Sequence, residues 1–191
     1  MNFREVISEL EAADVDAITV HARTREERYS GTPHYDLIEG LGREMSVPLM
    51  VSGNMFSLED AVRAVRMTGA QGVMIARGGV GNPYLATQVD RYFRDGTRLE
   101  NPTVAQQVDW CLELADMLFE EKGDDVAVRK LRSMAPKFVV GCRRSREYRY
   151  RLATELDGRE DLERILGEVR DSMGDKRVRT LGYKTSVPND D

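Results

Sequence analysis

Short apolar runs alternate with amphipathic stretches through the first hundred residues. Residues 16–21, 48–52 and 72–76 form apolar runs with the length of buried strands, and glycines closely follow the second and third runs. Between these runs, apolar residues recur every three or four positions, as they do in a helix that buries one face. Strands that alternate with such helices pair in parallel, so the pattern predicts an α/β fold with three parallel strands.

The residue types that precede several periodic stretches are those that begin helices. Asn2, Ser57, Thr103 and Asp157 each precede an apolar helical stripe and have an acid or an amide three residues further on. This spacing is typical of side-chain caps at helix N-termini. A further helix is expected over residues 34–45, where the apolar residues share one face.

The pattern changes near Asn101-Pro102 from strands and helices to helices alone. We therefore expect an α/β domain over residues 1–100 and a small all-α domain over residues 101–173. Residues 174–191 contain glycine, proline and charged residues without periodicity. Such a segment is expected to form a mobile tail.

Composition excludes several classes of protein. Hydrophobic residues make up 41% of the chain and charged residues 32%, as in globular proteins. No run approaches the roughly 18 apolar residues of a membrane helix, and the N-terminus has no apolar signal-peptide core. We therefore expect a cytoplasmic protein with no membrane partner.

The few cysteines and histidines argue against a metal site. The chain has two residues of each type, and the two cysteines fit no paired metal spacing. A disulfide is not expected in a reducing compartment. Cys111 occupies an apolar helical position and is expected to be buried and structural. Cys142 lies in a basic loop, where a lowered thiol pKa is expected.

Charge is distributed unevenly along the chain. The net charge is −5, but residues 129–151 hold nine basic residues and one acidic residue, Glu147. Such an asymmetry favours an anionic partner over the alternative of a solvated helix face with salt bridges. Tyr148 and Tyr150 alternate with the arginines and are candidates for stacking on RNA bases.

The carboxyl ends of the strands carry the candidate chemistry, because (β/α) barrel enzymes build their sites there. Small residues after the second and third strands, at 52–54 and 76–79, would let backbone N–H groups approach a phosphate. Arg77 would add a guanidinium. The alternative is that these are ordinary turn glycines. His21 alone is more typical of a satisfied rim residue, and Arg23 of a solvated charge.

Three ordered motifs resemble one family. HARTREERYSG (21–31), PLMVSGN (48–54) and TGAQGVMIARGGVGNP (68–83) are similar to the second half of the tRNA-dihydrouridine synthases. The resemblance implies the C-terminal part of a (β/α)8 TIM barrel with a helical domain. It also implies FMN, NAD(P)H as reductant, and reduction of the C5–C6 bond of uridines in tRNA.

The resemblance assigns residues to two ligands. The cofactor-binding residues would be His21, Arg23, Ser52, Gly53, Asn54, Ala76, Arg77 and Gly78. The RNA-binding residues would be Arg129, Lys130, Arg132, Lys137, Arg143, Arg144 and Arg146.

The chain departs from the family pattern in several places. Ser52 and Asn54 replace the usual Asn and Asp of the second turn, and residues 131–141 lack the family's His and Trp. The catalytic cysteine motif Asn-x-Gly-Cys-Pro and the flavin-contacting lysine are absent, so no catalytic residue is assigned. About five of the eight barrel strands are also missing. We expect the N-terminal barrel half as a partner and little activity without it.

Two other functions are compatible with the sequence. A flavin barrel enzyme that acts on a small molecule would share the glycine-rich turns without needing the basic helices. An RNA-binding or assembly subunit would keep the fold without catalysis. Flavin colour and tRNA binding would separate these possibilities.

Overall fold

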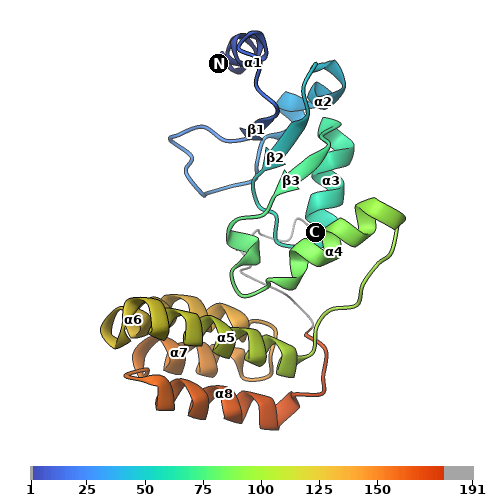
Figure 1. Ribbon diagram of the computed structural model, residues 1–191. Helices are drawn as coiled ribbons and strands as arrows, with labels where there is room; N and C mark the ends of the chain where they lie inside the picture. The colour runs from blue at the N-terminus through green and yellow to red at the C-terminus, as the bar shows by residue number, and fades with distance from the viewer. Residues whose placement is uncertain (1, 179–191) are drawn as a thin grey trace. The chain divides into compact units, whose positions relative to one another are not determined.

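The computed structural model describes residues 2–178 of the chain. These residues form two compact units (Figure 1). The boundary between the units lies between Ala76 and Arg77. Each unit has its own arrangement of elements. We call the first the sheet unit and the second the helical unit.

The sheet unit contains three parallel strands, as the apolar runs predict. β1 (Ile18–His21), β2 (Leu49–Ser52) and β3 (Gly72–Met74) lie in the order β1-β2-β3. In this register His21 lies opposite Ser52, and Ser52 lies opposite Met74. The carboxyl ends of all three strands therefore share one edge of the sheet.

Four short helices accompany the strands: α1 (Phe3–Ala12), η1 (Tyr35–Ile38), α2 (Leu41–Glu44) and α3 (Leu58–Thr68). α3 packs against β2, β3 and η1. Its start is capped as predicted, because the Ser57 hydroxyl accepts a hydrogen bond from the Asp60 amide at 3.1 Å.

Two predictions for this unit are wrong. Asn2 precedes α1 but makes no capping bond, and its backbone is not in the extended conformation that side-chain caps need. The expected helix over residues 34–45 is instead the 3₁₀ turn η1 followed by α2. Gly40 interrupts it with a φ of +71°, and the Gly40 amide bonds the carbonyl of Met67. That left-handed residue ends the first turn.

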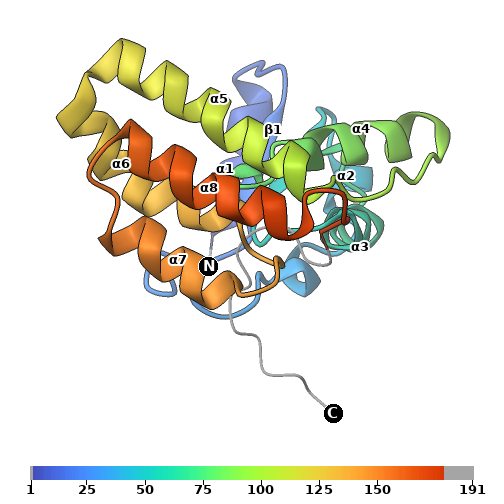
Figure 2. The same ribbon diagram turned by 90° about the horizontal axis from the view of Figure 1, so that it is seen from below.

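The helical unit begins with the 3₁₀ turn η2 (Arg77–Gly79) and contains five α-helices within the described residues. They are α4 (Tyr84–Asp95), α5 (Val104–Lys122), α6 (Asp124–Phe138), α7 (Ser145–Thr154) and α8 (Arg159–Met173). α5 packs on α6, α6 on α7, α7 on α8 and α8 on α5, so these four helices form a closed ring (Figure 2).

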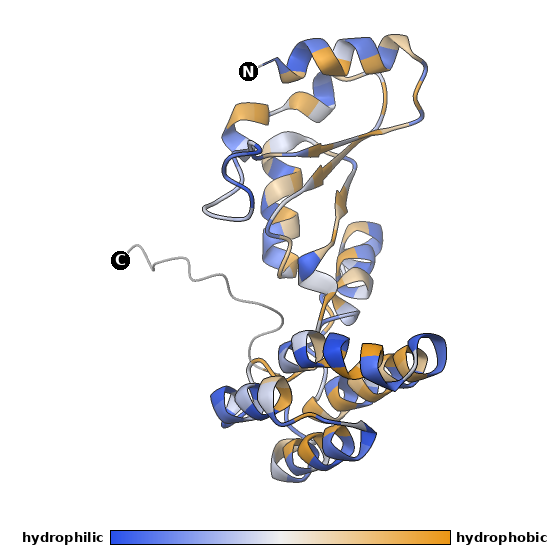
Figure 3. Cartoon of the chain, turned by 90° about the vertical axis from the view of Figure 1, so that its left-hand side faces the viewer, coloured by the Kyte–Doolittle hydropathy of each residue, from blue (hydrophilic) through white to orange (hydrophobic). Residues whose placement is uncertain are grey.

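The ring encloses one apolar core. Its fully buried members come from every helix of the ring, and the inner faces of the helices are hydrophobic in Figure 3. They include Val104, Cys111, Leu131, Leu152, Leu156, Leu162, Ile165 and Leu166. The confirmed burial of Cys111 agrees with its predicted structural role. Helix α4 was not predicted, although Pro83 and the buried Leu85 and Val89 are typical of a helix start and an apolar stripe.

Of the two helix caps predicted for this unit, one is confirmed and one is wrong. Thr103 and Gln106 form the expected reciprocal capping box of α5. The expected cap by Asp157 is wrong, because α8 begins after Gly158 and the Asp157 amide instead donates to the Asp161 carboxylate.

The predicted mobile tail is also wrong in its first part. The amides of Val104 and Ala105 donate to the carbonyls of Lys176 and Gly174, and the Val178 amide donates to the carbonyl of Pro102. Residues 174–178 are therefore fixed against the start of α5. Residues 179–191 lie outside the described part of the chain.

Between Asn2 and Val178, no helix has the length and apolar character needed to cross a membrane. The same residues contain no cluster of three or more His, Cys, Asp or Glu side chains suited to a metal ion.

Candidate functional site

The carboxyl ends of β1 and β2 bring two predicted site residues into contact. The Nδ1 atom of His21 lies 3.1 Å from the Ser52 hydroxyl, and the two residues are directly paired in the sheet register. Ser52 is 9% exposed, whereas His21 is exposed. The hydrogen bond orients the imidazole ring at the carboxyl end of β1.

A second pair joins the loop after β1 to the turn after β2. The Arg23 guanidinium donates to the Asn54 side-chain oxygen at 2.9 Å and to the Gly31 carbonyl at 2.8 Å. Asn54 has a φ of +47°, a left-handed conformation that asparagine tolerates better than most residues. Arg23 is therefore not the solvated charge expected of an isolated arginine, because it ties two segments together.

The backbone conformation and the close packing at position 53 explain why a glycine stands there. Its φ is +130°, and a Cβ atom there would lie 2.8 Å from the Pro33 ring. This close approach favours the turn-glycine interpretation for this position. It leaves the phosphate interpretation of the neighbouring backbone amides as a prediction.

Tyr35 supports this turn and was missed in the sequence. Its hydroxyl donates to the Gly53 carbonyl at 2.5 Å, and burial raises the pKa of the phenol to about 12. A high pKa keeps the phenol protonated as a donor at any physiological pH. The only available signal was a tyrosine placed shortly after Pro33 in the loop.

The residues after β3 divide between the two units. Ala76 is exposed and follows the end of β3 at the same sheet edge. Arg77 and the buried Gly78 belong to η2 in the helical unit. Their assignment to a phosphate remains a prediction from the sequence.

The predicted RNA-binding residues fall into two classes. Arg132 pairs with Asp157 at 2.6 Å and bonds the Leu156 carbonyl, and Arg144 pairs with Glu147 on the next turn. These two arginines are largely neutralised within the helical unit. The salt-bridge alternative therefore describes part of the basic stretch correctly.

The remaining predicted cations have no acidic partner among the described residues. Within residues 2–178, no carboxylate pairs with five of the seven predicted residues, nor with the neighbouring Arg149. The five are Arg129, Lys130, Lys137, Arg143 and Arg146; all but the half-buried Lys137 are exposed. Arg146 and Arg149 lie on the same side of α7 because they are three residues apart.

The two tyrosines of α7 have different surroundings. Tyr148 is 2% exposed, and the guanidinium groups of Arg144 and Arg151 lie 5.6 and 5.9 Å from the centre of its ring. Base stacking by Tyr148 is therefore a wrong prediction, since the ring packs in the core. Tyr150 is 66% exposed, and its stacking on RNA bases stays a prediction.

Neither cysteine is suited to acid–base chemistry. Burial raises the thiol pKa to about 12 for Cys111 and to about 11 for Cys142. The expected lowered pKa of Cys142 is wrong, because its side chain packs in the apolar core of the helical unit rather than among the arginines of its loop.

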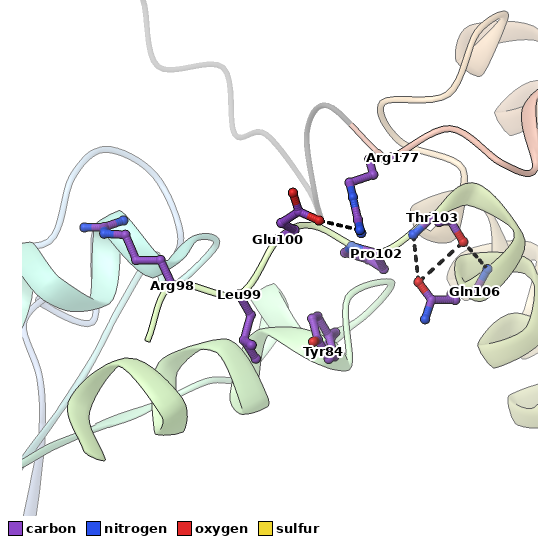
Figure 4. A pocket seen from close by; sticks show the side chains of 8 residues that line it. All are labelled: Tyr84, Arg98, Leu99, Glu100, Pro102, Thr103, Gln106 and Arg177. Atoms are coloured by element: carbon purple, nitrogen blue, oxygen red, sulfur yellow. Dashed lines mark hydrogen bonds and ion pairs between the residues drawn. The ribbon is translucent and has the colours of Figure 1, made fainter. Parts of the chain in front are cut away.

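A pocket of about 580 Å³ lies beside the start of α5 (Figure 4). Its lining residues are Tyr84, Arg98, Leu99, Glu100, Pro102, Thr103, Gln106 and Arg177. Anion binding at this helix start is disfavoured because its amides already have partners. The backbone amides of Thr103 and Gln106 each donate to the other residue's side chain. The amides of Val104 and Ala105 donate to the carbonyls of Lys176 and Gly174. The Arg177 side chain, which also lines the pocket, pairs with Glu100.

Comparison with known proteins identifies one family. The dihydrouridine synthase family model matches residues 1–172. The chain is similar to the probable tRNA-dihydrouridine synthase 1 of Synechocystis sp., with 28% identity over 89% of this chain and 48% of the relative.

Two further relatives give the same result. The probable tRNA-dihydrouridine synthase of Rickettsia conorii is 32% identical over 73% of this chain and 42% of the relative. The tRNA-dihydrouridine synthase B of Pseudomonas putida is 28% identical over 87% of this chain and 48% of the relative. The chain thus spans about half the length of the curated relatives it matches. Because the family model covers most of its residues, the chain belongs to the dihydrouridine synthase family.

Proposed function

We propose that this chain forms the carboxyl-terminal part of an FMN-dependent tRNA-dihydrouridine synthase. In this function NAD(P)H is the reductant, and a uridine of tRNA is reduced to dihydrouridine. The family match over residues 1–172 and the names of the relatives support the proposal.

One observation of the structure carries this proposal. His21 and Ser52 come from motif segments about thirty residues apart, and the parallel register brings them within 3.1 Å at the carboxyl edge of the sheet. Ligands of parallel α/β proteins bind at this edge. The family motifs therefore meet where a cofactor site is expected.

The residues at this edge fit a flavin mononucleotide. His21 and Ser52 place an imidazole ring and a hydroxyl at this edge, and Arg23 and Asn54 hold each other in the turn that follows β2. When bound, the flavin would transfer a hydride from the nicotinamide to the uridine. Gly53 and Ala76 would complete the edge, while Arg77 and Gly78 enter the proposal from the sequence resemblance alone.

The helical unit would bind the tRNA backbone. The cations that have no carboxylate partner within residues 2–178 would attract phosphates without first losing a salt bridge, and Tyr150 offers an exposed ring for stacking. This feature favours tRNA over a small molecule as the substrate.

The proton donor would come from outside this chain. Both thiols are buried in the apolar core of the helical unit, so neither is accessible to a substrate as a proton donor. Among the described residues, β1 and β3 each also lack a neighbouring strand on one side. We therefore propose the N-terminal barrel half as the partner. Its strands would pair with the free sides of β1 and β3, and it would supply the missing acid.

Flavin titration tests the proposal. FMN binding by the full chain is measured through the quenching of flavin fluorescence. The affinity should fall about threefold to tenfold in His21→Ala and in Ser52→Ala. Thr19→Ala, an exposed position on the same strand, is the matched control and should bind normally. Equal affinity in all four proteins would place the flavin elsewhere, and no binding at millimolar FMN would refute the proposal for this chain.

A further inference from the structure

The loop between β1 and η1 closes on itself. The His34 amide donates to the Ala22 carbonyl at 2.8 Å, so the two ends of residues 22–34 lie together. Compact loops with joined ends pack through their own side chains and often carry function. The question is which side chains hold this loop in one shape.

Arg23 forms the inner attachment of the loop. Its guanidinium donates to the carbonyls of Ser30 and Gly31 at 3.2 and 2.8 Å and to the Asn54 side chain at 2.9 Å. The Asn54 amide also donates to the Gly31 carbonyl. The shape of the loop therefore determines where Arg23 and Asn54 lie at the sheet edge.

Glu27 and His34 form an outer attachment, and neither residue is among the proposed site residues. One Glu27 oxygen accepts the Thr24 amide at 2.7 Å, and the other lies 2.5 Å from His34 Nε2. The Ser30 hydroxyl donates to the Glu27 carbonyl at 2.7 Å. Glu27 thus connects the start, the middle and the end of the loop.

We infer that Glu27 and His34 are positioning residues that clasp residues 22–34 and hold Arg23 on Asn54 more firmly in mildly acidic than in alkaline solution. The inference rests on the proposed function in one respect, since Arg23 and Asn54 are proposed residues of the flavin edge. The clasp itself rests only on the geometry of the loop.

The charges around the pair give the sign of the pH effect. The hydrogen bond with His34 lowers the pKa of Glu27 to about 2, and the same bond raises the pKa of His34 above 6.5. Asp36 also raises the pKa of His34, whereas Arg23 lowers it. Asp60 and Arg63 of α3 act on Tyr35 instead.

The pH window follows from these two shifts. The contribution of His34 is complete below pH 6.5 and is lost as the pH rises through its elevated folded value. The contribution of Glu27 is complete above pH 4.5 and is lost as the pH falls toward about 2. The clasp is therefore strongest between roughly pH 4.5 and 6.5.

NMR on the full chain without cofactor tests the clasp. The His34 ring should titrate with a pKa above 6.5, and Glu27→Gln should return this value to the ordinary range. Backbone order of residues 24–30, measured by ¹⁵N relaxation, should fall between pH 6 and pH 8.5 in the natural sequence.

Two variants sharpen the test. His34→Gln keeps a donor without a titrating group, so its loop order should not change with pH. Glu44→Gln removes an exposed ion pair with Arg4 elsewhere in the sheet unit and should leave the His34 titration unchanged. An unshifted His34 pKa in Glu27→Gln, or loop order independent of pH in the natural sequence, would overturn the inference.

A parallel FMN titration separates this inference from the proposed function. If the clasp titrates as expected and FMN does not bind, the flavin assignment fails while the clasp stands. If FMN binds and the loop ignores pH, the clasp fails while the flavin assignment stands.

Discussion

The two units of this protein bury their apolar residues in different ways. The four helices of the ring pack in a closed cycle around one core, so each apolar face has a partner. Within the described residues the sheet unit has three strands, and each outer strand is paired on one side only. The ring helices therefore cover one another's apolar faces, whereas the two outer strands of the sheet each keep one side without a strand partner among the described residues.

The largest effect should come from the core of the helical unit. Leu152→Ala removes a fully buried side chain and should lower the free energy of unfolding by about 2–5 kcal/mol. Leu10→Ala on the partly exposed α1 is the matched control and should lower it by less than about 1 kcal/mol. Urea unfolding of both variants measures the difference, and similar losses would contradict the contrast between the units.

A second variant examines the turn at the open edge. Gly53→Ala forces a side chain into a φ of +130° and toward Pro33, so it should destabilise the protein by about 1–3 kcal/mol. Gly167→Ala in α8 meets no atom within 4 Å and should instead stabilise by about 0.5–1 kcal/mol. Thermal unfolding distinguishes the two signs.

Helix caps give a smaller effect. Thr103→Ala removes the capping box of α5 and should cost about 1 kcal/mol in chemical unfolding. Asn2→Ala should cost almost nothing, because Asn2 makes no capping bond in α1. A loss for Asn2→Ala equal to that for Thr103→Ala would contradict the observed helix start.

The two classes of arginine predict the smallest changes, which are changes in tRNA binding rather than in stability. Arg146→Gln and Arg149→Gln should each reduce the salt slope of tRNA binding by about 1. Arg132→Gln, which removes a cation already paired with Asp157, should change the slope less. Filter binding over a range of salt concentrations tests this, and equal changes would mean that pairing does not decide which arginines bind.

The sequence predicts elements whose pattern is local. The three strands, the Ser57 cap and the Thr103 capping box all depend on neighbouring residues, and each is confirmed. The expected helix over residues 34–45 fails because Gly40 takes a left-handed conformation and bonds Met67, which is distant in the chain.

Side-chain surroundings were harder to predict than elements. Cys142 and Tyr148 lie among arginines in the sequence, yet both pack into the core of the helical unit. Tyr35 and the Glu27–His34 pair support the sheet edge through contacts that only the folded loop creates. The sequence therefore indicates which strand ends carry the proposed site, whereas its supporting residues are recognised only in the folded chain.

Our central proposal is that the carboxyl ends of β1 and β2, with the turn after β2, hold the phosphate of a flavin. Comparing FMN with riboflavin, which lacks the phosphate, in binding to the full chain tests this claim most directly. The account predicts that FMN binds about ten- to a hundredfold more tightly, as charge-assisted hydrogen bonds to the phosphate would require. Equal affinities for the two flavins would contradict it.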